Sequence, residues 1–148
     1  MRAVVQRVSS SSVSVGGQNV GTISKGINVL LAVRQGDDIS DAGNLADRIM
    51  RLRIFPDAEG KMNLSVQDIK GGILVISQFT LYGDCAKGTR PSFTESADAK
   101  TAEFLYGQFL GHLKEHYANR IESGVFGAMM EVDIQNDGPV TLILESRK

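Results

Sequence analysis

Apolar, mostly β-branched residues interspersed with polar ones dominate the first 33 positions of the chain. Segments of this kind favour strands, and the Gly-Gly pair at 16–17 and the Lys-Gly pair at 25–26 are typical turn signals between them. A run of serines at 9–12 indicates a bulge or a turn. The pattern predicts four strands, over Arg2–Val8, Ser12–Val15, Asn19–Ser24 and Ile27–Val33.

The apolar residues then change to a helical period. Between positions 42 and 52 they recur three and four residues apart, which predicts a helix over Asp41–Arg51 with Ser40 or Asp41 as its N-cap. A second helix is predicted to begin near Ser96. Its apolar face consists of Ala102, Leu105, Tyr106, Phe109 and Leu113.

The most apolar run predicts a central strand over residues 73–81. Two further strands are expected over residues 128–135 and 140–146, joined by a hairpin turn at 136–139, because Asp-Gly between strands is a strong hairpin signal. About seven strands flank two helices, which favours the α+β class. We expect one domain, 1–148, built as a curved antiparallel or mixed sheet, or a small β-barrel, covered by the two helices.

Composition limits the function classes. No apolar run approaches the roughly 20 residues of a membrane helix, so no membrane partner is expected. A single cysteine, Cys85, allows no internal disulfide and fits a cytoplasmic location. The net charge of −1 disfavours DNA or RNA binding by bulk electrostatics. Any RNA partner must therefore be held by a small local patch.

Several chemistries can be weighed and set aside. The segment 112–116 reads His-Leu-Lys-Glu-His, which formally matches a reversed zinc-peptidase signature. On a helix, however, Glu115 points away from the face that carries His116, and no third metal ligand stands out. No glycine-rich phosphate loop is present. Nothing in the sequence directs a base toward Cys85, so a catalytic thiol is disfavoured.

Two segments remain unexplained by packing. Ser77, Gln78 and Thr80 end the apolar run, where they either form the solvated face of an edge strand or mark a functional site at a strand end. Pro139 is awkward within a strand because it donates no ladder bond. The segment 136–141 is either a hairpin turn or holds a cis Gly138–Pro139 bond whose carbonyls act as fixed acceptors.

Three motifs together resemble the D-aminoacyl-tRNA deacylases. They are SQFTL at 77–81, GTRPSF at 88–93 and NDGPVT at 136–141, and the opening MRAVVQRV and the segment from 53 to 84 resemble the same family. The likeness covers nearly the whole chain. It implies a metal-free and cofactor-free hydrolase that cleaves the ester between a D-amino acid and the 3′-terminal adenosine of tRNA. Glycine mischarged on tRNA-Ala is an expected second substrate.

The resemblance also implies a homodimer with the active site at its interface. Ser77, Gln78, Phe79 and Thr80 would come from one subunit, and Gly138 and Pro139 of the other would form a cis main-chain selector against L-residues. The N–H groups of Gln78 and Phe79 are candidate donors to the oxyanion, and Thr80 is either a nucleophile or a positioning residue.

Four more residues are candidate substrate contacts. We expect Arg7 to brace the Gly-Pro segment. Met129, with Phe79, is a candidate wall for the adenine, although core packing is the favoured interpretation for both residues. Lys87 and Arg90 are candidate phosphate contacts, and a solvated loop explains Lys87 equally well.

Overall fold

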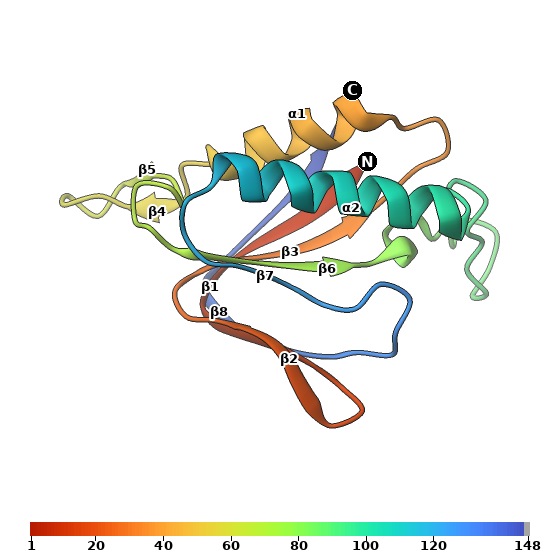
Figure 1. Ribbon diagram of the computed structural model, residues 1–148, viewed down its shortest axis with the longest axis horizontal. Coiled ribbons are helices and arrows are strands. Elements are labelled where there is room, and N and C mark those ends of the chain that lie inside the picture. Colours follow the sequence, from red (N-terminus) through yellow and green to blue (C-terminus); the bar gives the residue numbers. More distant parts are fainter. Residues whose placement is uncertain (147–148) are drawn as a thin grey trace.

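The computed structural model describes residues 1–146, so the last two residues of the expected domain, 147–148, lie outside the described part. The chain forms a mixed sheet, a small hairpin, two α-helices and one 3₁₀-helix (Figure 1). The elements are β1 (Arg2–Val15), β2 (Gln18–Ile23), β3 (Gly26–Ala32), α1 (Ile39–Met50), β4 (Phe55–Pro56), β5 (Met62–Leu64), β6 (Gly72–Ser77), η1 (Phe79–Tyr82), α2 (Ala99–His116), β7 (Ile121–Ser123) and β8 (Glu131–Glu145).

The long strand β1 organises the sheet. On one edge, its first half pairs with β3 and its second half with β2, and β8 runs along its other edge, all antiparallel. The strands β3, β6 and β7 follow in parallel. The sheet curls so far that a Cβ on Gly21 of β2 would lie 3.3 Å from the carbonyl oxygen of Ser123 in β7. The nearly closed mixed sheet confirms the α+β prediction.

Both helices cover one face of the sheet and lie side by side (Figure 1). Their apolar residues pack on the inward side chains of β1, β3 and β6 to form the main core, in which Phe55, Leu45 and Phe109 are fully buried. The helices begin at acidic caps, Asp38 for α1 and Asp98 for α2. The predicted cap at Ser40 or Asp41 is therefore wrong. Asp41 instead completes a capping box with Asp38, which satisfies free N–H groups of the first turn.

The other face of the sheet is only partly filled. A smaller apolar cluster sits inside the curl: Val8, Val13, Ile23, Leu74 and Ile76. Beyond it, Val4 pairs with Leu30 on one side and Ile143 on the other, so these three residues form a row across the sheet. Val4 and Leu30 are half-buried and Ile143 is 70% exposed. An apolar row therefore faces outward from the side without helices.

Strand β8 replaces the predicted hairpin at 136–139. Its two halves both pair with β1, through Asn136 to Val8 and Thr141 to Gln6, and the residues between form a bulge opposite Arg7. The hairpin prediction is wrong because an Asp-Gly pair also serves a bulge, in which Gly138 supplies a φ of 124°.

Candidate functional site

Strand β6 ends at Ser77, where the chain turns into the 3₁₀-helix η1. The turn is closed by backbone bonds from Leu81 N–H to the Gln78 carbonyl (3.2 Å) and from Gly83 N–H to the Thr80 carbonyl (2.9 Å). The predicted strand over 73–81 is therefore too long, and the alternation of faces expected for residues 77–80 does not apply. The polar residues mark a strand end that opens into a turn.

The main-chain N–H groups of this turn differ in whether they have a hydrogen-bond acceptor. The N–H of Gln78 donates to the Leu31 carbonyl at 2.8 Å and continues the sheet, so the prediction that it serves an oxyanion is wrong. Within residues 1–146, the N–H groups of Phe79 and Thr80 have no hydrogen-bond acceptor. Both residues are exposed. Two adjacent main-chain donors are thus free to bind an oxygen atom.

The side chains around the turn bond one another. The amide of Gln78 donates to the hydroxyl oxygen of Thr80, and Ser77 is half-buried at the strand end. No histidine stands near them. His112 Nε2 lies 2.7 Å from Asp47 Oδ1 and joins α2 to α1, and this hydrogen bond lowers the pKa of Asp47. His116 Nδ1 contacts the His112 carbonyl at 2.9 Å.

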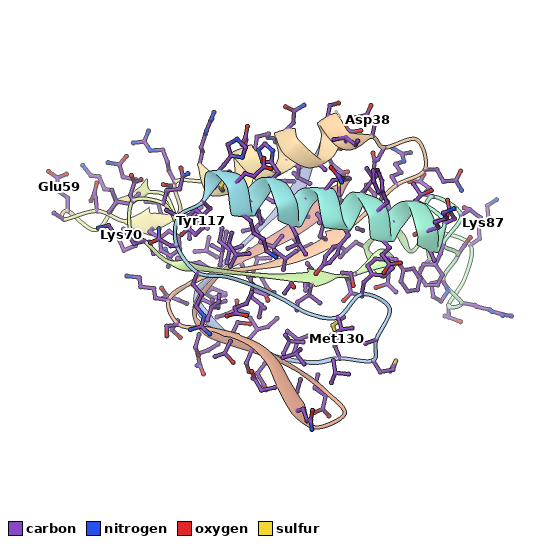
Figure 2. The ribbon with its side chains drawn as sticks, in the orientation of Figure 1. Asp38, Glu59, Lys70, Lys87, Tyr117 and Met130 are labelled. Atoms are coloured by element: carbon purple, nitrogen blue, oxygen red, sulfur yellow. The ribbon has the colours of Figure 1, made fainter. Side chains whose placement is uncertain are left out.

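The second motif meets the first at this turn. The ring of Phe93 packs edge-on against the ring of Phe79, with centroids 5.1 Å apart. Next to it, the Ser96 hydroxyl donates to the Phe79 carbonyl at 3.1 Å. The preceding loop is closed by a bridge between Asp84 and Ser92, and it carries Lys87 and Arg90 on the exposed rim of the molecule, where Figure 2 labels Lys87.

The loop between β7 and β8 lies beside the end of β6 (Figure 1). At the start of this loop, the N–H of Gly124 donates a hydrogen bond to the Val75 carbonyl at 3.0 Å. Further along, Val125 is 46% and Met129 is 91% exposed, and Phe79 across the turn is 56% exposed. Core packing therefore does not account for Met129 or Phe79, both of which present apolar surface to solvent.

The third motif is held by Arg7. Gly138–Pro139 is a cis peptide, one of the two conformations that its sequence allowed. The guanidinium of Arg7, half-buried beside it, donates from Nε to the Asp137 carbonyl (3.1 Å) and from Nη1 to the Ile54 carbonyl (2.7 Å). It also pairs with the Asp137 carboxylate at 3.3 Å. Arg7 thereby ties the bulge of β8 to the chain just before β4.

Strand registers separate the third motif from the first two. Ser77 is level with Leu31, Ala3 and, on β8, Leu144, whereas the Gly-Pro bulge is opposite Arg7. The offset is four residues along β1 and three strand spacings across the sheet, which amounts to about 20 Å. Within one chain, the Gly-Pro carbonyls and the free N–H groups therefore belong to different places on the surface.

Clefts and metal-binding clusters do not indicate another site. A cleft of about 340 Å³ is lined by polar residues including Arg34, Asp37 and Glu95, and a second of about 230 Å³ by Ser10–Ser12 and their neighbours. Neither contains a predicted site residue. Among residues 1–146, no group of three or more His, Cys, Asp or Glu side chains is arranged to hold a metal ion. In the same range, no helix is long and apolar enough to span a membrane.

Comparisons with known proteins agree along the whole chain. The family model described as D-Tyr-tRNA(Tyr) deacylase matches residues 4–145. Proteins named D-aminoacyl-tRNA deacylase from Thermosipho melanesiensis and Clostridium botulinum are 54% and 56% identical over 148 residues, covering 100% of this chain and 99% of each relative.

Two solved structures have a similar fold. One described as c-Myc DNA Unwinding Element Binding Protein has a TM-score of 0.94 and 44% identity, with both chains covered completely. A probable eukaryotic D-amino acid tRNA deacylase has a TM-score of 0.81 at 16% identity, over 97% of this chain and 98% of its own. The second likeness concerns the fold alone.

Proposed function

The chain belongs to the D-Tyr-tRNA(Tyr) deacylase family, and from this membership we propose that it hydrolyses D-aminoacyl-tRNA in the cytoplasm. Water attacks the ester carbonyl carbon, the bond to the ribose oxygen breaks, and that oxygen leaves with a proton. The products are a free D-amino acid and tRNA. The observation that carries the proposal is the pair of free N–H groups at Phe79 and Thr80, at the end of a buried strand.

Hydrolysis of this ester does not require a strong nucleophile from the protein. An aminoacyl ester is already activated, so orientation and stabilisation of the oxyanion suffice. The N–H groups of Phe79 and Thr80 would bind the developing negative charge. Ser77 and Gln78 would keep the turn in place, Gln78 through its bond to the Thr80 hydroxyl. The 2′-hydroxyl of the terminal adenosine is available as an internal catalytic group.

Thr80→Ala is expected to keep kcat within about tenfold of the wild type, because the variant retains the main-chain N–H and loses only the hydroxyl. That hydroxyl accepts a bond from Gln78 and has no base beside it. Single-turnover deacylation of D-tyrosyl-tRNA measures the effect. A loss of about a thousandfold or more, or a trapped acyl-enzyme on the wild type, would instead identify Thr80 as a nucleophile.

A complete site needs two chains. The ammonium nitrogen of an aminoacyl ester lies about 2.5 Å from the carbonyl carbon under attack. Main-chain carbonyls that hold the ammonium must therefore lie close to the oxyanion donors, whereas in one chain the two are about 20 Å apart. We infer a two-fold dimer in which Gly138 and Pro139 of each subunit enter the site of the other.

The apolar row across β3, β1 and β8 supports this dimer. Val4, Leu30 and Ile143 lie on the face without helices, and the outer edge of β8 has no strand partner within residues 1–146. Burying such a row against its symmetry mate removes apolar area from water on both subunits. The same association would carry the Gly-Pro bulge, which lies on β8, to the partner.

Chiral selection would follow from the main chain. Carbonyl oxygens of Gly138 and Pro139 would hold the ammonium, and an L-side chain would then meet this peptide wall. A clash of about 4 kcal/mol rejects the L-ester roughly a thousandfold. The side chain of a D-residue would point outward. Glycine has no side chain to reject, so glycine mischarged on tRNA-Ala would be cleaved as well.

The remaining contacts concern the tRNA end. Phe79, at the free N–H groups, and Met129, on the loop between β7 and β8, are both exposed and would receive the adenine ring. Lys87 and Arg90 stand on the exposed rim of the neighbouring loop and would approach phosphates. Arg7 would act on the substrate indirectly, by fixing the Gly-Pro bulge.

The decisive experiment is a paired deacylation assay. D-tyrosyl-tRNA is expected to be cleaved at least about a hundredfold faster than L-tyrosyl-tRNA, before and after treatment with a chelator. Comparable rates for the two esters would overturn the proposal. Loss of activity on chelation would overturn its metal-free chemistry. Binding of the D-ester without turnover would identify a noncatalytic module for tRNA ends.

A further inference from the structure

The Phe79–Thr80 peptide group is contacted on one side only. Its carbonyl oxygen accepts the hydroxyl of Ser96 at 3.1 Å. Its N–H, that of Thr80, has no acceptor within residues 1–146. Because this peptide is trans, the carbonyl and the N–H point in opposite directions. The Ser96 bond therefore adds to the 3₁₀ bonding of η1 in holding the direction in which the Thr80 N–H points.

The hydrogen bond also changes the donor itself. A carbonyl that accepts a hydrogen bond makes the N–H of the same peptide a stronger donor, since linked hydrogen bonds polarise one another. The effect is larger where water is excluded. An oxyanion bound to the Thr80 N–H would thus be stabilised through the peptide by a side chain that never touches it.

Ser96 is itself held by the sheet. The N–H of Ala97 donates to the Val33 carbonyl (3.1 Å), and the N–H of Gln35 donates to the Glu95 carbonyl (3.0 Å). Arg34 forms a β-bridge with Ser96 and an ion pair with Glu95. These contacts fasten residues 95–97 to the chain directly after β3. The hydroxyl of Ser96 is therefore presented by the scaffold and not by the exposed loop at 84–92.

We propose that Ser96 is a positioning residue for the hydrolysis, acting through the Phe79–Thr80 peptide on the Thr80 N–H. The inference rests on the proposed function of this turn and adds a residue outside the three motifs. The proposed role belongs to Ser96 and not to Phe93, because Phe93 contacts the same turn only through its ring.

The test compares three variants on D-tyrosyl-tRNA. Ser96→Ala is expected to lower kcat about tenfold, less than removal of a direct oxyanion donor, with KM changed by less than about twofold. Ser96→Thr keeps a hydroxyl and is expected to stay within about threefold of the wild type. Ser92→Ala is the matched control, because Ser92 is an exposed serine of the same segment whose side chain has no hydrogen bond within residues 1–146.

A spectroscopic readout tests the connection without turnover. The ¹⁵N chemical shift of the Thr80 amide reports on a hydrogen bond to the preceding carbonyl. We expect this chemical shift to change in Ser96→Ala and to remain at the wild-type value in Ser96→Thr and Ser92→Ala. All three variants are expected to have the melting temperature of the wild type. An unchanged kcat in Ser96→Ala, an unmoved Thr80 resonance, or equal losses in Ser96→Ala and Ser96→Thr would overturn the inference. A wild type inactive on the D-ester would instead overturn the proposed function.

Discussion

Replacing Gly138 by alanine is expected to lower kcat/KM for D-tyrosyl-tRNA by about a hundredfold, the effect of a displacement of roughly 1 Å in a positioning group. Gly138 has a φ of 124°, which L-residues rarely adopt. A Cβ there would lie 3.0 Å from Val140 Cγ2 and 3.1 Å from Arg7 Nη2. Since Arg7 is held at both Asp137 and Ile54, the bulge must move instead.

The control for this variant is Gly60→Ala in the turn of the β4–β5 hairpin. Gly60 has a φ of 79°, and a Cβ there would meet no atom within 4 Å. It therefore carries a backbone penalty of the same kind without the clash against Arg7. Deacylation rates for the D- and L-esters, measured with thermal unfolding of both variants, separate the two effects. A Gly138→Ala enzyme as active as Gly60→Ala would rule out a role of the bulge in substrate binding.

Mixing two inactive variants is expected to recover about a quarter of the wild-type activity, if the sites lie between two-fold-related subunits. One variant is Gly138→Ala. The other is Thr80→Pro, which deletes the free N–H. The bonds donated by Leu81 and Gly83 do not involve that N–H and remain available to close the turn. In a mixed dimer, one site receives both defects and the other receives none.

The quarter follows from random exchange. Half of the dimers are mixed, and half of the sites in each mixed dimer are intact. A double variant with both changes, exchanged with the wild type in the same way, is the control. It should leave about a quarter of the activity for an interfacial site and about half for a site within one chain. No recovery in the first mixture and half in the second would show that each chain holds a complete site.

The sequence pattern predicted the fold class and the main elements better than it predicted where each helix and strand begins and ends. The helices and the central strand follow from apolar spacing, which depends on neighbours in sequence. The cap at Asp38 was missed because Asp38, Ser40 and Asp41 are all good caps, and only the reciprocal bonds with Asp41 decide between them. The Asp-Gly pair at 137–138 was misread as a hairpin, because pairing with β1 on both sides is a property of the sheet.

For the site, the local chemistry was visible and the geometry was not. The polar residues after the apolar run indicated a functional strand end, and the motif likeness named the residues. Which N–H groups are free depends on where β6 stops pairing with β3, so Gln78 was assigned in place of Thr80. Ser96 carries no local signal at all, because its contact with Phe79 spans 17 positions and requires residues 95–97 to pack against the chain after β3.

The pairing of the first long strand with the last has a consequence for biosynthesis. Residues 16–130 must all be made before β8 can dock on β1. At about 5–20 residues per second, the interval is roughly 6–23 s. During this interval β1 lacks its pairing with β8, so apolar side chains that the finished sheet buries stay exposed to water. The pairing of β8 with β1 is therefore a late step in the formation of this sheet.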